Sequence, residues 1–235
     1  MNDFNHPLVS PAGIRERLSA FGLAPNKALG QNFLADNSAL SALLDALPGD
    51  RLPVLEIGPG LGALTGGLLD RSNRVVAVEK DAAMAAALQS LTPEERLTVV
   101  EADFLKADLN ELHALLGGGE FVVAGNLPYY ITTPCVLKLL SSGLPMRALL
   151  LMLQQEAAER FFALPGDRVY GPLTVLAACG YKAEEVLRLS PAAYYPQPDV
   201  HSAVVLLTQT AAAPPVGFLT FLQAAFAMRR KTLVN

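Results

Sequence analysis

From about residue 37 onward, short apolar segments alternate with longer segments in which apolar positions recur at helical spacing. Continuous apolar runs predict strands buried on both faces, and the helical spacing predicts amphipathic helices that cover them. Seven strands are predicted in this way, at residues 53–57, 74–79, 97–101, 121–125, 149–153, 181–189 and 202–208. Helices are predicted from a cap at Asn37 to about 47, up to about 71, from a cap at Asp81, over about 134–141 and over about 218–232.

The order of these elements predicts an α/β fold, a mostly parallel sheet with helices on both faces in a Rossmann-like arrangement. The last two strands are joined by a proline-rich loop that is too short for a helical crossover, so we expect them to pair antiparallel. A linker at 211–215 separates residues 1–210 from the final helix. The first 25 residues carry little pattern, and we expect them to be mobile.

The composition supports one large domain with a filled core, because 51% of the 235 residues are hydrophobic and 17% are charged. No apolar run reaches the ~18–20 residues that a membrane span requires. The N-terminus also lacks a basic segment followed by an apolar one. We therefore expect a cytoplasmic protein without a membrane segment.

Cysteines, histidines and charge restrict the chemistry further. Cys135 and Cys179 lie far apart in apolar helical stretches, and we expect two buried thiols. The three histidines share no spacing typical of a metal site or a nucleophile–base pair, so no metal is expected. The net charge of −4 counts against nucleic acid, and the one dense basic spot, 229–231, is typical of a solvated helix end. A nucleic-acid substrate must therefore be argued from a catalytic motif.

The strongest local signal is Glu-Ile-Gly-Pro-Gly-Leu-Gly at 56–62, between a predicted strand and a predicted helix. Its glycines let the backbone turn sharply and approach a ligand. Glu79 ends the next strand, where its carboxylate can accept hydrogen bonds from both hydroxyls of a ribose. Gly58, Gly60 and Ala63 also satisfy the dinucleotide fingerprint, so nicotinamide binding, or a turn without a ligand, stays open on these residues alone.

Asp103 favours S-adenosylmethionine as the cofactor. It follows the third predicted strand, at the sheet edge where open α/β folds bind ligands, and its carboxylate can accept a hydrogen bond from an adenine amino group. An aspartate that only caps a helix or a loop is the alternative. Glu56 is either a cofactor contact or a strand carboxylate bound to backbone amides.

The sequence Asn-Leu-Pro-Tyr-Tyr follows the fourth strand, at 126–130. Adenine N6 is a weak nucleophile because its lone pair is delocalised into the ring, and two acceptors aimed at its hydrogens would localise that pair for attack on a sulfonium methyl. The Asn126 side-chain oxygen and the Leu127 carbonyl can supply both acceptors, Pro128 fixes the turn, and Tyr129 offers a face for an extruded base. A polar turn with a buried tyrosine is the alternative, but the position behind a glycine-rich turn favours catalysis.

Together these motifs resemble those of the ribosomal RNA adenine N6,N6-dimethyltransferases, over about residues 25–209 and 225–235. The likeness is nearest to the bacterial members that dimethylate two adjacent adenosines near the 3′ end of 16S rRNA and whose loss gives kasugamycin resistance. The segment 29–34, Leu-Gly-Gln-Asn-Phe-Leu, is similar to the family's N-terminal cofactor lid. The segment 191–204 is similar to the loop before the family's last strand, and Asp199 stands there in place of a commonly basic residue.

The resemblance implies a class I methyltransferase fold and assigns roles to several residues. It implies that S-adenosyl-L-methionine binds to Asn32, Leu34, Gly58, Gly60, Glu79, Asp103 and Asn126. It implies catalysis by Asn126, Leu127, Pro128 and Tyr129. The target base would stack between Tyr129 and Tyr194, a position where the family usually has Phe.

The resemblance also implies the substrate and the domain organisation. The enzyme would act as a monomer on 16S rRNA within the 30S subunit or its precursor, during small-subunit maturation. Residues 1–210 would form the methyltransferase domain, and residues 211–235 a linker and the first helix of a C-terminal helical domain.

Four other functions fit part of the pattern. Large-subunit adenine methylases of macrolide resistance are typically basic and read Asn-Ile-Pro-Tyr, whereas this chain is acidic and has Leu127. N6-adenine DNA methyltransferases more often carry two prolines after Asp or Asn. A nicotinamide oxidoreductase would be stabilised by NADH, and a non-catalytic RNA-binding assembly factor would not need an intact motif at 126–129.

Overall fold

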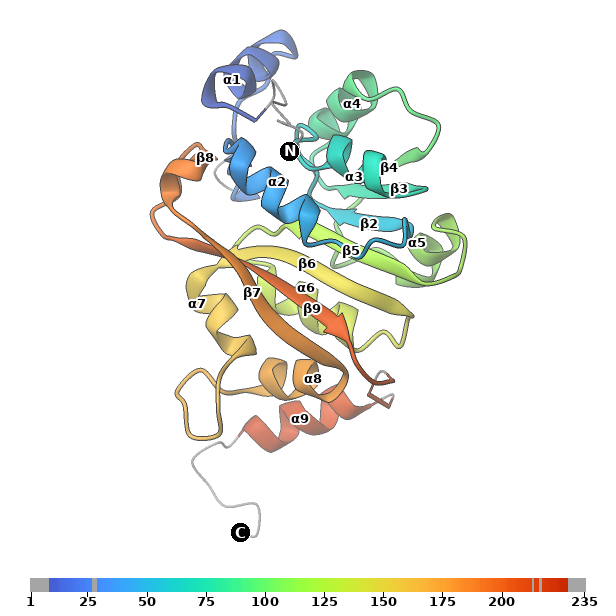
Figure 1. The fold of residues 1–235 in the computed structure, drawn as a ribbon, viewed down its shortest axis with the longest axis vertical. Coiled ribbons are helices and arrows are strands. Elements are labelled where there is room, and N and C mark those ends of the chain that lie inside the picture. The colour runs from blue at the N-terminus through green and yellow to red at the C-terminus, as the bar shows by residue number, and fades with distance from the viewer. Residues whose placement is uncertain (1–8, 27–28, 213, 216, 228–235) are drawn as a thin grey trace.

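The computed structural model describes residues 9–26, 29–212, 214–215 and 217–227. A seven-stranded sheet in the order β4-β3-β2-β5-β6-β9-β7 forms its centre (Figure 1). The strands are β2 (Val54–Ile57), β3 (Val75–Glu79), β4 (Leu97–Glu101), β5 (Phe121–Asn126), β6 (Met146–Gln154), β7 (Tyr181–Leu189) and β9 (Ser202–Gln209). The first five strands in this order, β4, β3, β2, β5 and β6, pair in parallel, and β9 runs antiparallel to both β6 and β7. The predicted α/β class, the seven strands and the antiparallel final pair are confirmed.

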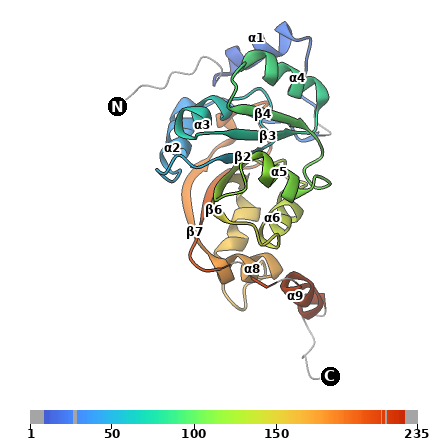
Figure 2. The same cartoon turned by 90° about the vertical axis from the view of Figure 1, so that its right-hand side faces the viewer.

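Helices cover both faces of this sheet, which explains why its central strands are mostly apolar. The helices are α1 (Pro11–Ala20), α2 (Asn37–Asp45), α3 (Thr65–Arg71), α4 (Ala82–Leu91), α5 (Leu109–Leu115), α6 (Thr132–Leu140), α7 (Gln155–Ala158), α8 (Pro172–Gly180) and α9 (Phe218–Ala227), with 3₁₀ turns at Glu159–Phe161 and Pro191–Ala193. Helices α2 and α3 pack on one face, and α5, α6 and α8 on the other (Figure 2). Helix α9 packs against α8 through the buried Leu222.

The chain order creates a switch point in the middle of the sheet. From β2 the chain proceeds through β3 to β4 on one side, and then returns to β5 on the other side of β2. The loops that leave the carboxyl ends of β2 and β5 therefore diverge, and open α/β sheets bind ligands in the crevice that results. The glycine-rich turn follows β2, and Asn126 is the last residue of β5.

A second, two-stranded sheet was not predicted. Strand β1 (Phe33–Leu34) pairs antiparallel with β8 (Tyr194–Tyr195), so that Leu34 lies opposite Tyr194. Two-residue strands are too short to show an alternating pattern in a sequence. The pairing joins the N-terminal segment to the loop before β9.

The expectation of a mobile N-terminus is wrong for Pro11–Ala20, which form α1. The Ser10 hydroxyl accepts a hydrogen bond from the Gly13 amide (3.1 Å) and caps the helix. Ile14 and Leu18, four positions apart, are buried in a cluster with Met84 of α4. Two apolar positions on one face are enough to hold this helix but give little sequence pattern.

Several predicted boundaries are also corrected. Asp36, not Asn37, caps α2, because its carboxylate accepts the Ala39 amide hydrogen bond (3.0 Å), and the helix ends at Asp45. Helix α6 begins at Thr132, ahead of the predicted start. The predicted end of the last helix and the basic triplet at 229–231 lie outside the described residues.

The prediction of two buried thiols is half wrong. Cys135 of α6 is buried against the sheet, whereas Cys179 is exposed. Cys179 lies on the side of α8 that faces away from Leu173, Leu176 and Ala177, which pack into the core. Among the described residues, no helix is long and apolar enough to cross a membrane, and no cluster of His, Cys, Asp and Glu could hold a metal.

Candidate functional site

One cavity lies at the switch point, over the carboxyl ends of β2 to β5. Its wall includes the glycine-rich turn, the ends of β3 and β4, the segment 126–131 and the N-terminal segment 29–34. Ten of the residues singled out in the sequence line it together: Asn32, Leu34, Gly58, Gly60, Glu79, Asp103, Asn126, Leu127, Pro128 and Tyr129. Segments separated by almost one hundred positions in the chain therefore meet at one site.

The glycine-rich turn is held by the end of the neighbouring strand. Gly58 and Gly60 have φ angles of 68° and 55°, a region that residues with a Cβ rarely adopt. A Cβ at Gly60 would lie 2.9 Å from the ring of Phe33, so only glycine lets β1 cover the turn. The Gly60 amide donates to a carboxylate oxygen of Glu79 at 3.1 Å, and the Asp81 amide donates to the other at 2.9 Å.

Two buried carboxyls lie at the floor of the cavity. Glu56 is 1% exposed, and burial raises its pKa to about 8, although the Thr65 hydroxyl donates to it at 2.7 Å. Burial also raises the pKa of Glu79, against the opposing effect of its backbone hydrogen bonds. The sequence left two roles open for Glu56, a cofactor contact or a carboxylate bound to backbone amides. The second is wrong, because the Glu56 carboxyl accepts from the hydroxyl of Thr65 in α3. Glu56 also lines the cavity.

Asp103 follows β4 and remains a charged acceptor. One carboxylate oxygen accepts the Leu105 amide at 3.0 Å, and the other forms an ion pair with Lys80 at 3.0 Å. The hydrogen bond from Lys80 is the main reason that the pKa of Asp103 is lowered. Each carboxylate oxygen can accept more than one hydrogen bond, so capacity remains for an amino group in the cavity.

The side-chain amide of Asn126 is oriented by the N-terminal segment. Its nitrogen donates to the backbone carbonyl of Asn32 at 2.7 Å. A carbonyl only accepts hydrogen bonds, so the amide group must present its nitrogen to Asn32, and in the described part of the chain no hydrogen bond uses its oxygen. The Leu127 amide donates to the Met152 carbonyl at 3.1 Å, and within the described residues no hydrogen bond uses the Leu127 carbonyl oxygen. The two acceptors predicted from the sequence are therefore both available.

The two tyrosines predicted to enclose a base lie in different surroundings. Tyr129 is half-buried at the cavity wall, and its hydroxyl lies 3.1 Å from that of Ser202 at the start of β9. Burial raises the pKa of the Tyr129 phenol. Tyr194 is only 2% exposed, packs in the core and does not line the cavity. Its hydroxyl lies near that of Ser202 but makes no well-aligned hydrogen bond among the described residues.

Sequence reasoning missed several residues of the site. Lys80 pairs with Asp103, Thr65 with Glu56, and Ser202 with Tyr129. Lys80 directly follows Glu79, the last residue of β3. Its position in the sequence could have predicted an ion pair at the cavity. The partners of Thr65 and Ser202 depend on tertiary packing and left no local pattern.

Comparisons with known sequences point to one family. A sequence model of the family described as Ribosomal RNA adenine dimethylase matches residues 22–235. The chain is 39% identical to Ribosomal RNA small subunit methyltransferase A of a Geobacillus species over 241 residues, which cover 98% of this chain and 82% of the relative. It is 38% identical to the protein of the same name from Bacillus licheniformis over 240 residues, with the same coverage of both.

Solved structures give the same picture. A dimethyladenosine transferase from Plasmodium falciparum has a TM-score of 0.73 at 28% identity, over 86% of this chain and 73% of that one. The 23S rRNA methyltransferase ErmE has a TM-score of 0.66 at 28% identity, over 84% of this chain and 78% of that one.

Proposed function

The chain belongs to the ribosomal RNA adenine dimethylase family, and from this premise we propose that it methylates N6 of adenosines in 16S rRNA. Its methyl donor is S-adenosyl-L-methionine, and its substrate class is ribosomal RNA. The observation that carries the site assignment is the orientation of Asn126, which keeps a side-chain acceptor in the same cavity as the Leu127 carbonyl.

Residues of the cavity fit the nucleoside of this donor. Glu79 lies at the end of β3, where its carboxylate can accept from ribose hydroxyls, and Asp103 can accept from the adenine amino group. Ile57, Val78 and Phe104 line the cavity between them and supply apolar contacts for an adenine ring. When bound, the donor supplies an electrophilic methyl group on a sulfonium.

The chain's own contribution to the chemistry is positional and electrostatic. Asn126 Oδ1 and the Leu127 carbonyl accept hydrogen bonds from the exocyclic amino group, which localises the N6 lone pair toward the methyl group. Pro128 holds this backbone, and Tyr129 supports the base by stacking. No histidine lines the cavity in the described part of the chain, and the mechanism needs no strong base, because positioning and preorganised acceptors lower the barrier.

Tyr194 is the less supported member of the proposed base site. Tyr194 belongs to β8 and its side chain packs in the core, so stacking on a base requires that this loop open. We propose that Tyr194 stacks on the base only in such an open state.

The finer features of the function are proposals as well. We propose two adjacent adenosines near the 3′ end of 16S rRNA as targets, presented by the 30S subunit or its precursor in the cytoplasm, with the enzyme acting as a monomer. The names of the relatives, small subunit methyltransferase A, support the choice of subunit. We also propose that residues 1–210 form the catalytic domain and that 211–235 begin a helical one, and the packing of α9 on α8 supports this division.

The choice of RNA can be tested directly. Purified protein is incubated with labelled S-adenosylmethionine and either 30S particles from a strain that lacks this methylation or a protein-free 23S rRNA transcript. We expect label in the 30S particles only. Label confined to the 23S transcript would contradict the proposed substrate and favour a macrolide-resistance methylase.

A further inference from the structure

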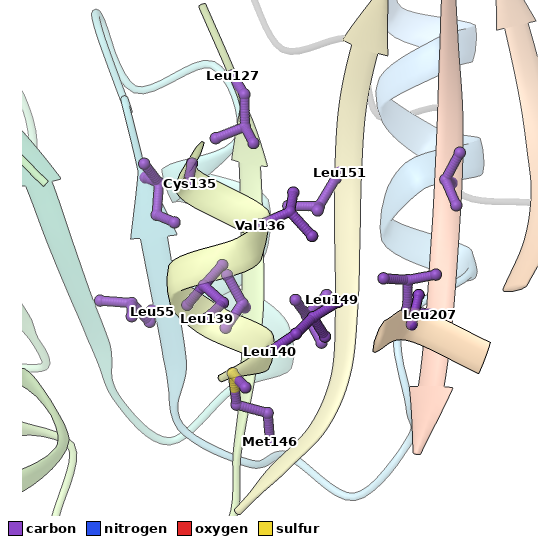
Figure 3. Close-up of a cluster of buried hydrophobic side chains, with 14 of the residues drawn as sticks. Leu55, Leu127, Cys135, Val136, Leu139, Leu140, Met146, Leu149, Leu151 and Leu207 are labelled. Carbon is purple, nitrogen blue, oxygen red and sulfur yellow. The ribbon is translucent and has the colours of Figure 1, made fainter. Parts of the chain in front are cut away.

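Helix α6 begins directly after the segment 126–131 and is fixed firmly to the sheet. Figure 3 shows Val136, Leu139 and Leu140 of this helix packed among side chains of the neighbouring strands, with Leu149 and Leu151 of β6 beside them. All five are at most 1% exposed. The helix is therefore a rigid support for any side chain that projects from its other faces.

Lys138 projects from this helix toward the loop between β4 and α5. Its ammonium donates hydrogen bonds to three backbone carbonyls, those of Phe104 (2.9 Å), Leu105 (3.0 Å) and Ala107 (2.6 Å). An ammonium has three donors, and all three are used. The same nitrogen lies 5.4 Å from the centre of the Phe104 ring. Burial lowers the pKa of Lys138, and the three carbonyl dipoles offset the cost of keeping its charge there.

The loop that Lys138 holds is the one that positions Asp103. The Lys106 and Ala107 amides donate back to the Asp103 carbonyl at 2.8 and 3.0 Å, and the Leu105 amide donates to the Asp103 carboxylate at 3.0 Å. The amides of this turn thus converge on Asp103, while three of its carbonyls converge on Lys138. Asp103 and Phe104 both line the cavity.

We infer that Lys138 is a positioning residue for the methyl donor: it fixes the 103–107 turn, and with it the Asp103 carboxylate, relative to the Asn126 motif that directly precedes the same helix. The inference rests on the proposed function, because it assumes that Asp103 binds the adenine amino group. Lys138 itself does not line the cavity. Its effect should therefore appear in donor binding and be transmitted through Asp103.

The test compares Lys138→Met, which keeps the aliphatic stem and removes the donors, with Lys182→Met as a matched control. Lys182 is an exposed lysine of β7 that is paired with Glu184. The dissociation constant for S-adenosylmethionine is measured by calorimetry. The KM for S-adenosylmethionine and kcat are measured in a methyl-transfer assay with 30S particles as the acceptor. We expect K138M to weaken donor binding about tenfold or more. Its kcat at saturating donor should stay close to wild type, and K182M should change neither quantity.

A double-mutant cycle with Asp103→Ala separates positioning from general destabilisation. If Lys138 acts through Asp103, the K138M/D103A double variant should bind the donor about as weakly as D103A alone. Additive losses, or wild-type affinity in K138M, would overturn the inference. Wild-type affinity in D103A would instead overturn the proposed donor site. If K138M does not unfold cooperatively, Lys138→Gln, which keeps an amide donor group, replaces it under the same criteria.

Discussion

The side-chain nitrogen of Asn126 donates a 2.7 Å hydrogen bond to the backbone carbonyl of Asn32, across 94 positions of sequence. This bond joins the end of β5 to the segment just before β1, and β1 in turn pairs with β8. One interaction therefore orients the proposed catalytic amide and closes the N-terminal segment over the cavity. A side chain at position 126 that cannot accept a hydrogen bond should lower the rate of methyl transfer more than the affinity for the donor.

Asn126→Ala should lower kcat for methyl transfer by about 10²-fold or more, the usual effect of removing one preorganised hydrogen-bonding group. Binding of S-adenosylmethionine should weaken far less than turnover, because Glu79 and Asp103 keep their positions. Calorimetry and a labelled-methyl assay measure the two quantities separately. Asn110→Ala, at an exposed asparagine of α5, is the control. Near-normal turnover in N126A would rule out the proposed mechanism.

Tyr129 allows the ring and the hydroxyl to be tested separately. Tyr129→Phe removes only the hydrogen bond with Ser202, whereas Tyr129→Ala removes the face on which the base stacks. Stacking of a base on an aromatic side chain contributes roughly 1–3 kcal/mol, so Y129A should lose about 5- to 150-fold in kcat/KM for RNA. Y129F should lose much less. Equal losses in the two variants would show that the ring does not stack on the base.

Most of the fold could be predicted from the sequence because the central strands are buried on both faces and therefore mostly apolar. The same approach failed where pairing is short or depends on distant contacts. Two-residue strands such as β1 carry no period, and α1 shows only Ile14 and Leu18 on its buried face. Cys179 was misplaced because an apolar stretch does not reveal which side of its helix faces solvent.

The candidate site was predictable to a similar extent. Residues at strand ends, such as Glu79 and Asp103, could be placed because parallel strands bring their carboxyl ends to one edge. Lys138 could not, because its three partners are backbone carbonyls that no side-chain pattern reveals. Tyr194 was expected at the cavity from the resemblance alone, and the structure buries it.

Tyr194→Phe should stabilise the protein. The hydroxyl is buried near Ser202 without a well-aligned hydrogen bond among the described residues, and an unsatisfied buried polar group costs about 1–3 kcal/mol. The variant should gain up to this free energy of unfolding, measured by urea denaturation. Tyr181→Phe is the matched control: its buried hydroxyl donates to the Met146 carbonyl at 3.5 Å, so its loss should be neutral or destabilising. A destabilised Y194F would show that the hydroxyl has a partner after all.

Glu56 should make stability depend on pH. Its pKa is about 8 in the folded protein against an ordinary 4.5, so between these values the folded state holds a proton that the unfolded chain has released. Stability from this group is therefore highest at low pH and falls as pH rises through this window, by at most about 1.4 kcal/mol per pH unit. Glu56→Gln removes this pH-dependent contribution to the free energy of unfolding and keeps an acceptor for the Thr65 hydroxyl.

The melting temperature of E56Q minus that of wild type should consequently increase from pH 5 to pH 8. Glu120→Gln, at an exposed glutamate, is the control. A difference between E56Q and wild type that stays constant across this range would mean that Glu56 is ionised in the folded protein.

The most direct test of the central claim is the nucleoside product itself. Wild-type protein and N126A are incubated with S-adenosylmethionine and unmethylated 30S particles, and the digested 16S rRNA is analysed by mass spectrometry. We predict N6,N6-dimethyladenosine with the wild type and little or none with N126A. Methylation of another atom, or no methylated adenosine from a protein that binds the donor and the particle, would contradict the account.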